Sequence, residues 1–127
     1  MVLVASSSEV QEVLRRLMDS PVQEFAVTGI ALLDTDLTGE YIDGIPVVGD
    51  VSNVKEYLCH EWVDEVFIKI SDSEPYPSAL IDDLVVMGLT VHLSLNAMEK
   101  FSSGKKYVER MGDYTVVTSS INMTSLK

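Results

Sequence analysis

The stretch Val2-Leu3-Val4-Ala5-Ser6-Ser7-Ser8-Glu9-Val10 decides the fold, because a short apolar run passes directly into a helix-start signal. The apolar run predicts a buried strand. Ser6 and Glu9 have the spacing of a capping box. Behind them, apolar residues recur at helical spacing, at Val10, Val13, Leu14, Leu17 and Met18. This part of the chain therefore predicts a strand followed by an amphipathic helix, the first unit of an α/β fold.

The same alternation of strands and helices continues to residue 95. Further strands are expected at 25–33, in the short segment between Gly44 and Gly49, at 63–70 and at 90–95. Residues 39–44 read as a loop. Asp50 is expected to cap a helix whose inner face is Val51, Val54 and Leu58. A third helix carries Leu80, Ile81, Leu84 and Val85, and Gly88 is placed to end it.

After residue 100 the pattern changes to that of a hairpin, with strands at 107–111 and 114–118 around Gly112-Asp113. We therefore expect a three-layer, Rossmann-like α/β domain. Its sheet would hold five parallel strands in the order 3-2-1-4-5 with helices on both faces, extended by the C-terminal β-hairpin.

Composition narrows the class of protein. The chain has 127 residues, which suits one domain, and a net charge of −11, which argues against nucleic acid as a partner. Its single cysteine, Cys59, excludes an internal disulfide and a cysteine-based zinc site. The apolar runs are too short for a membrane helix, and the first residues lack a signal peptide's basic start. These features predict a reduced, cytoplasmic, soluble domain.

The charge is distributed unevenly along the chain. Residues 1–99 hold 18 acidic and 4 basic residues, whereas residues 100–127 hold 2 acidic and 5 basic ones. We accordingly divide the single domain into an α/β core at 1–99 and a basic hairpin and linker at 100–127. One hypothesis is that Lys100, Lys105, Lys106 and Arg110 form one face toward an anionic membrane surface or an adjoining region. The alternative is that they only decorate the hairpin.

In a sheet of this kind, ligands bind at the carboxyl ends of the strands beside the switch point. Here that point is the turn Ser6-Ser7-Ser8, which lacks the glycines of a dinucleotide-binding loop. Serine hydroxyls and a helix N-terminus can hold an anion, but the same residues serve equally as a plain helix cap. Asp34 and Asp36 lie where such a domain places the carboxylate that binds ribose, and they are also ordinary turn formers. We take these five residues as the candidate cofactor-binding site.

The remaining reactive residues do not predict an active site. His60, His92 and Cys59 belong to no paired motif, and His92 lies within an expected strand, which is typical of a structural position. The pair Asp82-Asp83 reads as a solvated helix face. No P-loop, nucleophile elbow or HExxH motif is present, and two carboxylates without further ligands do not fill a metal's coordination sphere. We expect neither catalytic residues nor a metal site.

The order of these blocks resembles a known family. The Asp34-Thr35-Asp36 turn, then Gly44-Ile45-Pro46-Val47-Val48-Gly49-Asp50, then Val63-Asp64-Glu65-Val66-Phe67-Ile68, is similar to the cytoplasmic, Rossmann-like, coenzyme A-binding-like domain of bacterial polyprenyl-phosphate sugar-phosphotransferases. These membrane-anchored enzymes start the synthesis of exopolysaccharide, capsule and O-antigen. The tail at 114–123 resembles the segment that leads into their catalytic region. The resemblance covers nearly the whole chain.

The resemblance implies a non-catalytic regulatory or interaction domain of a transferase in the inner membrane. Its partners would be the adjoining catalytic and transmembrane regions of a parent chain that continues past Lys127. A second copy of the chain, in a homo-oligomer, is a further candidate partner. The alternative function is a sensor with a degenerate glycine loop that binds a nucleotide, nucleotide-sugar, NAD(P) or coenzyme A. A third interpretation is a free-standing protein that shares only the fold. These residues do not identify a particular cofactor.

Overall fold

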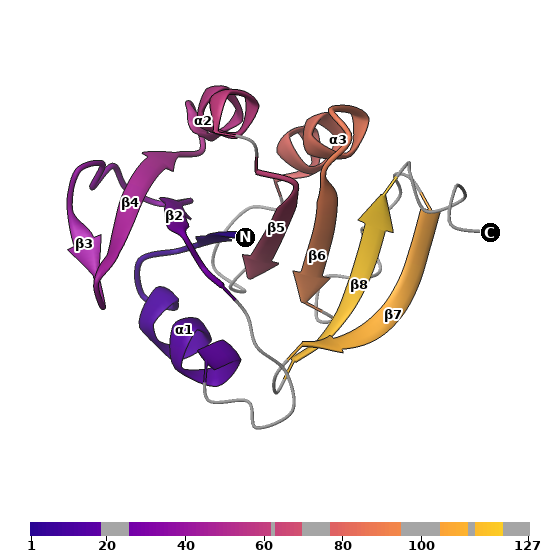
Figure 1. The fold of residues 1–127 in the computed structure, drawn as a ribbon, viewed down its shortest axis with the longest axis horizontal. Coiled ribbons are helices and arrows are strands. Elements are labelled where there is room, and N and C mark those ends of the chain that lie inside the picture. Colours follow the sequence, from indigo (N-terminus) through magenta and orange to yellow (C-terminus); the bar gives the residue numbers. More distant parts are fainter. Residues whose placement is uncertain (19–25, 62, 70–76, 95–104, 112–113, 121–127) are drawn as a thin grey trace.

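The computed structural model describes residues 1–18, 26–61, 63–69, 77–94, 105–111 and 114–120, and its elements are drawn in Figure 1. The strands are β1 (Val2–Ala5), β2 (Gly29–Leu32), β3 (Tyr41–Ile42), β4 (Ile45–Asp50), β5 (Glu65–Lys69), β6 (Thr90–Ser94), β7 (Lys105–Met111) and β8 (Tyr114–Ser120). The helices are α1 (Val10–Met18), α2 (Val54–His60) and α3 (Ser78–Val86). The predicted α/β class is confirmed.

The strands form one mixed sheet of eight strands in the order β3-β4-β2-β1-β5-β6-β8-β7. The prediction of a purely parallel five-stranded sheet is therefore wrong, since β3, β8 and β7 pair antiparallel with their neighbours. The centre of the sheet, β4-β2-β1-β5-β6, is parallel throughout, and these five strands follow the order 3-2-1-4-5 among themselves.

Two of these strands are shorter than expected. The strand predicted at 25–33 begins only at Gly29, and the one predicted at 63–70 spans Glu65–Lys69. Residues 25, 70 and 95, the outer ends of three predicted strands, lie outside the described residues. The pairing partners match these limits, because all four residues of β2 pair with β1, and β5 pairs with β1 at 66–69 and with β6 at 65–68.

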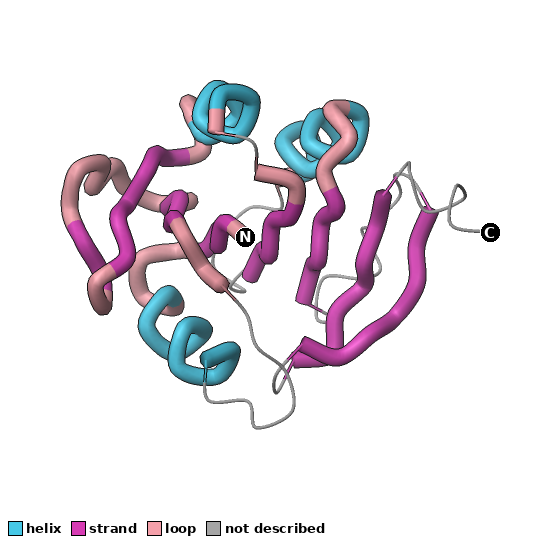
Figure 2. Tube along the Cα trace, in the orientation of Figure 1, coloured by secondary structure: helices cyan, strands magenta, loops and turns pink. Residues whose placement is uncertain are grey.

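The helices lie on both faces of the sheet, with α1 on one side and α2 and α3 on the other (Figures 1 and 2). Successive side chains of a strand point to opposite faces of the sheet, so the core is divided between the two faces. Val2 and Val4 of β1 pack in a cluster with α2 and α3, whereas Leu3 and Ala5 pack in a second cluster with α1. The sheet is thus buried on both faces at its centre, which explains the nearly continuous apolar runs of its parallel strands.

The first helix follows the predicted periodicity closely. Val10, Val13, Leu14 and Leu17 are buried against the sheet. Met18, expected on the same face, is 50% exposed because it is the last residue of α1 and lies beyond the edge of the buried stripe. At the other end, Ser6 contributes its backbone carbonyl, which accepts a hydrogen bond from the Glu9 N–H at 3.0 Å.

A short hairpin precedes the second helix where a loop was expected. β3 pairs antiparallel with β4, and Asp43-Gly44 forms the turn between them. Both turn residues adopt left-handed backbone angles, with φ of 51° at Asp43 and 82° at Gly44. Such angles are typical of the two-residue turn whose twist matches that of the flanking strands. The hairpin adds β3 to the outer edge of β4.

The start of α2 differs from the prediction. Asn53, rather than Asp50, is the residue that precedes the helix. Asp50 instead ends β4, and its carboxylate accepts hydrogen bonds from the N–H of Ser52 at 2.9 Å and from the Ser52 hydroxyl. Val51 is 45% exposed and does not belong to the inner face, since the helix begins three residues later than that face required.

Gly49 occupies a position where a larger residue would displace Asn53. A Cβ atom at Gly49 would meet Asn53 Oδ1, the atom that accepts a hydrogen bond from the Asp50 N–H at 2.8 Å. We therefore expect Gly49→Ala to lower the free energy of unfolding by about 1 kcal/mol, the net value of one hydrogen bond. Urea denaturation of the variant would measure this loss.

A double variant separates this contact from other effects of the added methyl group. In an Asn53→Ala background the obstacle and the hydrogen bond are both absent, so adding Gly49→Ala is expected to cost little more. Equal losses in the two backgrounds would contradict the role assigned to Asn53.

The third helix ends as predicted. Gly88 has a left-handed φ of 96°, which a residue without a Cβ adopts freely. The Gly88 N–H donates to the Val85 carbonyl at 3.0 Å, and the Leu89 N–H donates to the Leu84 carbonyl at 3.1 Å. These two bonds supply donors to carbonyls of the last turn of α3, and the chain then turns into β6.

The C-terminal hairpin is confirmed, and it joins the same sheet as the core. β8 pairs with β6, and β7 pairs with β8 at the outer edge. Of the four basic residues predicted to share one face, Lys100 lies outside the described residues. Lys105, Lys106 and Arg110 lie on β7, and a shared face of the four basic residues toward a membrane or an adjoining region stays a prediction.

Candidate functional site

The candidate site lies at the carboxyl ends of the central parallel strands. β2 and β5 flank β1 on its two sides, so the chain leaves β1 at the point where the strand order reverses. Ser6, Ser7 and Ser8 follow β1, Asp34 follows β2, and Lys69 is the last residue of β5. We call this edge of the sheet, with Ser6, Ser7, Ser8, Asp34 and Lys69, the switch-point crevice, after the place where ligands bind in open α/β sheets.

The structure brings Ser7 and Asp34 together in this crevice. The Ser7 backbone N–H donates to Asp34 Oδ1 at 2.8 Å, and the Ser7 hydroxyl donates to Oδ2 at 2.8 Å. The Asp34 carboxylate thus accepts two hydrogen bonds from the turn that leads into α1. An anionic ligand at this turn would need these same donors, and the chain's own carboxylate holds them.

These hydrogen bonds determine the acidity of Asp34. Desolvation raises the pKa of its carboxyl group, but the hydrogen bonds from the Ser7 backbone, the Ser7 hydroxyl and its own backbone N–H together outweigh that effect. The pKa of Asp34 is therefore held below its ordinary value of 3.8. Asp34 is a fixed anion at neutral pH, and it stabilises the turn in that form.

Asp34→Asn is expected to lower the stability by about 1 kcal/mol near neutral pH, the usual effect of losing an acidic group that caps backbone N–H groups. A depressed folded-state pKa stabilises the fold above the unfolded-state pKa, and that contribution is lost as the pH falls through the folded-state value. The difference between wild type and variant should therefore narrow below pH 3.8 and vanish at lower pH. Urea unfolding measured as a function of pH would show this.

Ser7→Ala is a matched control, because it removes the hydroxyl donor and keeps the backbone N–H. It should lose only part of the stability that Asp34→Asn loses. A constant difference between Asp34→Asn and wild type across the acidic range would contradict the assigned role of the charge.

The other three predicted site residues do not join this pair. Ser6 is buried, and its Oγ lies 3.4 Å from Oγ of Ser8, so the two hydroxyls contact each other. Asp36 accepts hydrogen bonds from the Thr38 hydroxyl at 2.6 Å and the Thr38 N–H at 3.1 Å, which lower its pKa. Asp36 therefore stabilises its own turn, away from the Ser7–Asp34 pair.

An ion pair closes the other side of the crevice. Lys69 Nζ lies 3.3 Å from Glu9 Oε2, and their side chains are only 18% and 26% exposed. The contact is an ion pair without hydrogen-bond geometry, since Glu9 Oε2 has no hydrogen-bond donor. Lys69 pairs with Ala5 of β1 in the sheet, so the Lys69–Glu9 ion pair connects the end of β5 to the segment that follows β1. The positive charge of Lys69, which could bind a phosphate group, is already neutralised by Glu9.

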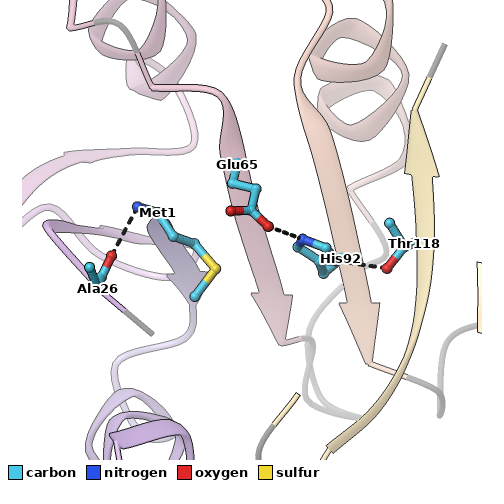
Figure 3. Close-up of polar contacts among 5 residues, drawn as sticks. All are labelled: Met1, Ala26, Glu65, His92 and Thr118. Atoms are coloured by element: carbon cyan, nitrogen blue, oxygen red, sulfur yellow. Dashed lines mark hydrogen bonds and ion pairs between the residues drawn. The ribbon is translucent and has the colours of Figure 1, made fainter. Parts of the chain in front are cut away.

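A second polar cluster, which sequence reasoning missed, crosses three strands on the hairpin side (Figure 3). His92 on β6 has Nε2 2.7 Å from Glu65 Oε2 on β5 and Nδ1 2.7 Å from Thr118 Oγ1 on β8. Because a carboxylate only accepts, Nε2 carries a proton, and in the neutral ring Nδ1 accepts the hydrogen bond from Thr118. His92 thus joins the parallel core to the hairpin.

The atoms of this cluster follow the order carboxylate, imidazole, hydroxyl, as in a nucleophilic triad. Thr118 is 0% exposed and His92 is 3% exposed, so the hydroxyl that would attack a substrate is enclosed by protein. Only Glu65, with a side chain 47% exposed, meets solvent. The expectation that His92 is structural agrees with this burial. No sequence signal places Thr118 beside it, because that contact depends on which strand the hairpin joins.

Two neighbouring hollows of the described surface lie away from the candidate site. A groove of about 560 Å³ runs between α2 and α3, lined among others by Lys55, Cys59 and Met87, and a hollow of about 500 Å³ adjoins it at Leu58 and Leu89. Neither includes a residue of the switch-point crevice. Within the described parts of the chain, no group of three or more His, Cys, Asp or Glu residues could hold a metal ion. No helix in those parts has the length and hydropathy to cross a membrane.

The chain was compared with protein-family models, with curated proteins and with solved structures, and none of the three comparisons gave a match.

Proposed function

We propose that this chain is a Rossmann-like, non-catalytic regulatory or interaction domain of a membrane-bound sugar-phosphotransferase that starts exopolysaccharide or capsule synthesis. The family assignment rests on the order and spacing of the blocks at 44–50 and 63–68. The central order β4-β2-β1-β5-β6, with its reversal beside β1, is compatible with the Rossmann-like part of the proposal. In the parent protein, the chain would act from the cytoplasmic side of the inner membrane.

One observation carries the non-catalytic part of the proposal: the chain's own side chains occupy the switch-point crevice. The Asp34 carboxylate accepts hydrogen bonds from the Ser7 N–H and hydroxyl, and Glu9 neutralises the charge of Lys69. A ligand with a phosphate group would have to displace one carboxylate and approach the other. Both carboxylates disfavour such a ligand by like-charge repulsion, which supports a domain without a bound nucleotide.

A thermal-shift panel tests this proposal against its alternative. The chain is incubated with nucleotides, UDP-sugars, NAD(P) and coenzyme A, each in turn. A ligand present at a hundredfold excess over its Kd would raise the apparent stability by about 2.7 kcal/mol. We expect none of these compounds to do so.

The alternative is a nucleotide or nucleotide-sugar sensor, and the meeting of Ser7 and Asp34 at the ends of β1 and β2 favours it. In that function the Asp34 carboxylate would bind a ribose hydroxyl. A stabilising compound whose effect disappears in Asp34→Ala but persists in Asp36→Ala would establish the sensor and refute the ligand-free domain. Asp36 is a suitable control because its hydrogen bonds go to Thr38.

The assignment to a transferase is tested in the parent protein. Deleting residues 1–127 should leave transfer of sugar phosphate to polyprenyl phosphate measurable and change its regulation or assembly. A parent gene without a sugar-phosphotransferase region would refute the family assignment while leaving the result of the ligand panel intact.

A further inference from the structure

The strand β7 is the last strand of the sheet order and lies at its outer edge (Figure 1). It is seven residues long, whereas β3 at the opposite edge has two. An edge strand presents a row of backbone N–H and C=O groups that another strand can bind, and shortness is one way to protect such an edge. β7 is not protected by shortness, but charged residues on an edge also discourage pairing, and β7 carries Lys105, Lys106, Glu109 and Arg110, so only a strand whose charges match these fits it well.

The charge pattern of β7 indicates which strand would fit. Two copies can pair antiparallel about a two-fold axis perpendicular to the sheet, and residues opposite each other then belong to the same face. With Tyr107 on the axis, Lys105 stands opposite Glu109 of the second copy, and this happens twice by symmetry. With Val108 on the axis, Lys106 would stand opposite Arg110 twice, which places like charges together.

The remaining registers are also less favourable. Lys106 on the axis would stand opposite itself, and so would Glu109 in the register centred on it. The register at Tyr107 is therefore the one in which this sequence complements itself. The rest of the surface suits self-association poorly, since residues 1–99 hold 18 acidic and only 4 basic residues.

We propose that β7 binds β7 of a second copy of this chain, antiparallel and centred on Tyr107, so that two eight-stranded sheets become one continuous sheet. The dimer forms through backbone hydrogen bonds along the two edges, and the two Lys105–Glu109 pairs set the register. This inference does not depend on the proposed function, because it rests only on the place of β7 in the sheet and on its sequence.

Sedimentation velocity of the whole chain, over a range from micromolar to near-millimolar concentration, tests the proposal. Wild type is expected to pass from monomer to dimer. Lys105→Glu and Glu109→Lys each place two like-charge pairs at the interface, so each should raise the dimer dissociation constant by about tenfold. The double variant Lys105→Glu/Glu109→Lys restores both pairs with reversed sign and should return the constant to near the wild-type value.

Lys106→Glu is the matched control, because it changes the same charge but stands opposite Val108 of the second copy. It should affect dimerisation less than Lys105→Glu. Circular dichroism of each variant would show whether it is folded. A wild-type chain that stays monomeric, a double variant that fails to recover, or equal effects of Lys105→Glu and Lys106→Glu would each overturn the proposal. If the chain stayed monomeric and bound anionic vesicles, the basic residues would instead face a membrane surface.

Discussion

Replacing Phe67 with alanine is expected to lower the free energy of unfolding by about 3–5 kcal/mol, the range for removing a large buried aromatic side chain. Phe67 is fully buried on β5 and packs in the cluster beneath α1. Its strand neighbours are Leu3 on β1 and His92 on β6, so the cavity would open at the centre of the sheet. Since domains of this size are stable by about 5–15 kcal/mol, the variant should be close to unfolding.

Urea denaturation of the variant would measure this loss. Val86→Ala is the control, because Val86 is apolar but 74% exposed, and its loss should stay below about 0.5 kcal/mol. A loss below about 1 kcal/mol for Phe67→Ala would mean that the cluster beneath α1 is not packed as described.

His92→Leu is expected to lower the free energy of unfolding by about 2–3 kcal/mol. Leucine keeps the apolar volume but cannot hydrogen-bond, so Thr118 loses its imidazole partner in a fully buried position. Glu65, being half-exposed, can hydrate instead and contributes less to the loss. Hydrogen exchange should also quicken at the amides of β8, because His92 links that strand to the parallel core.

A double variant shows whether the loss arises from the Thr118 hydroxyl. Replacing both partners of a buried hydrogen bond with apolar groups is less harmful than removing one. His92→Leu/Thr118→Val should therefore cost less than the sum of the two single variants, and urea denaturation of all three would give the coupling energy. Strictly additive losses would contradict the assigned hydrogen bond.

The parts of the fold that sequence predicts well are those set by local chemistry. The apolar spacing from Val10 to Leu17 identifies α1, and Gly88 identifies the end of α3. The hairpin β3–β4 was missed although Asp43-Gly44 is a strong local turn signal, because two residues of strand are too few to show an alternating pattern. Asp50 was misassigned as the cap of α2 because aspartate is a common cap, whereas the helix begins after Asn53, whose side chain makes no capping hydrogen bond.

The candidate site was predicted only in part, for a similar reason. Parallel βαβ topology places the residues after β1 and β2 at one edge, which is why Ser7 and Asp34 could be grouped in advance. That Asp36 turns toward Thr38 instead depends on the local geometry of its loop. The Glu65–His92–Thr118 cluster requires the antiparallel pairing of β8 with β6, and the intervening residues carry no sequence signal for that choice.

The place of β8 in the sheet has a consequence for synthesis of the protein on the ribosome. β6 ends at Ser94, but the strand that covers its free edge is complete only at Ser120. At about 5–20 residues per second, the chain between them takes roughly 1–5 s to make. For a similar interval after β6 has left the ribosome, the nascent core presents β6 as an open edge with which neighbouring nascent chains can pair. A translation pause that holds β8 inside the ribosome while β6 is outside should therefore favour aggregation, and a chaperone that shields strand edges would act in that interval.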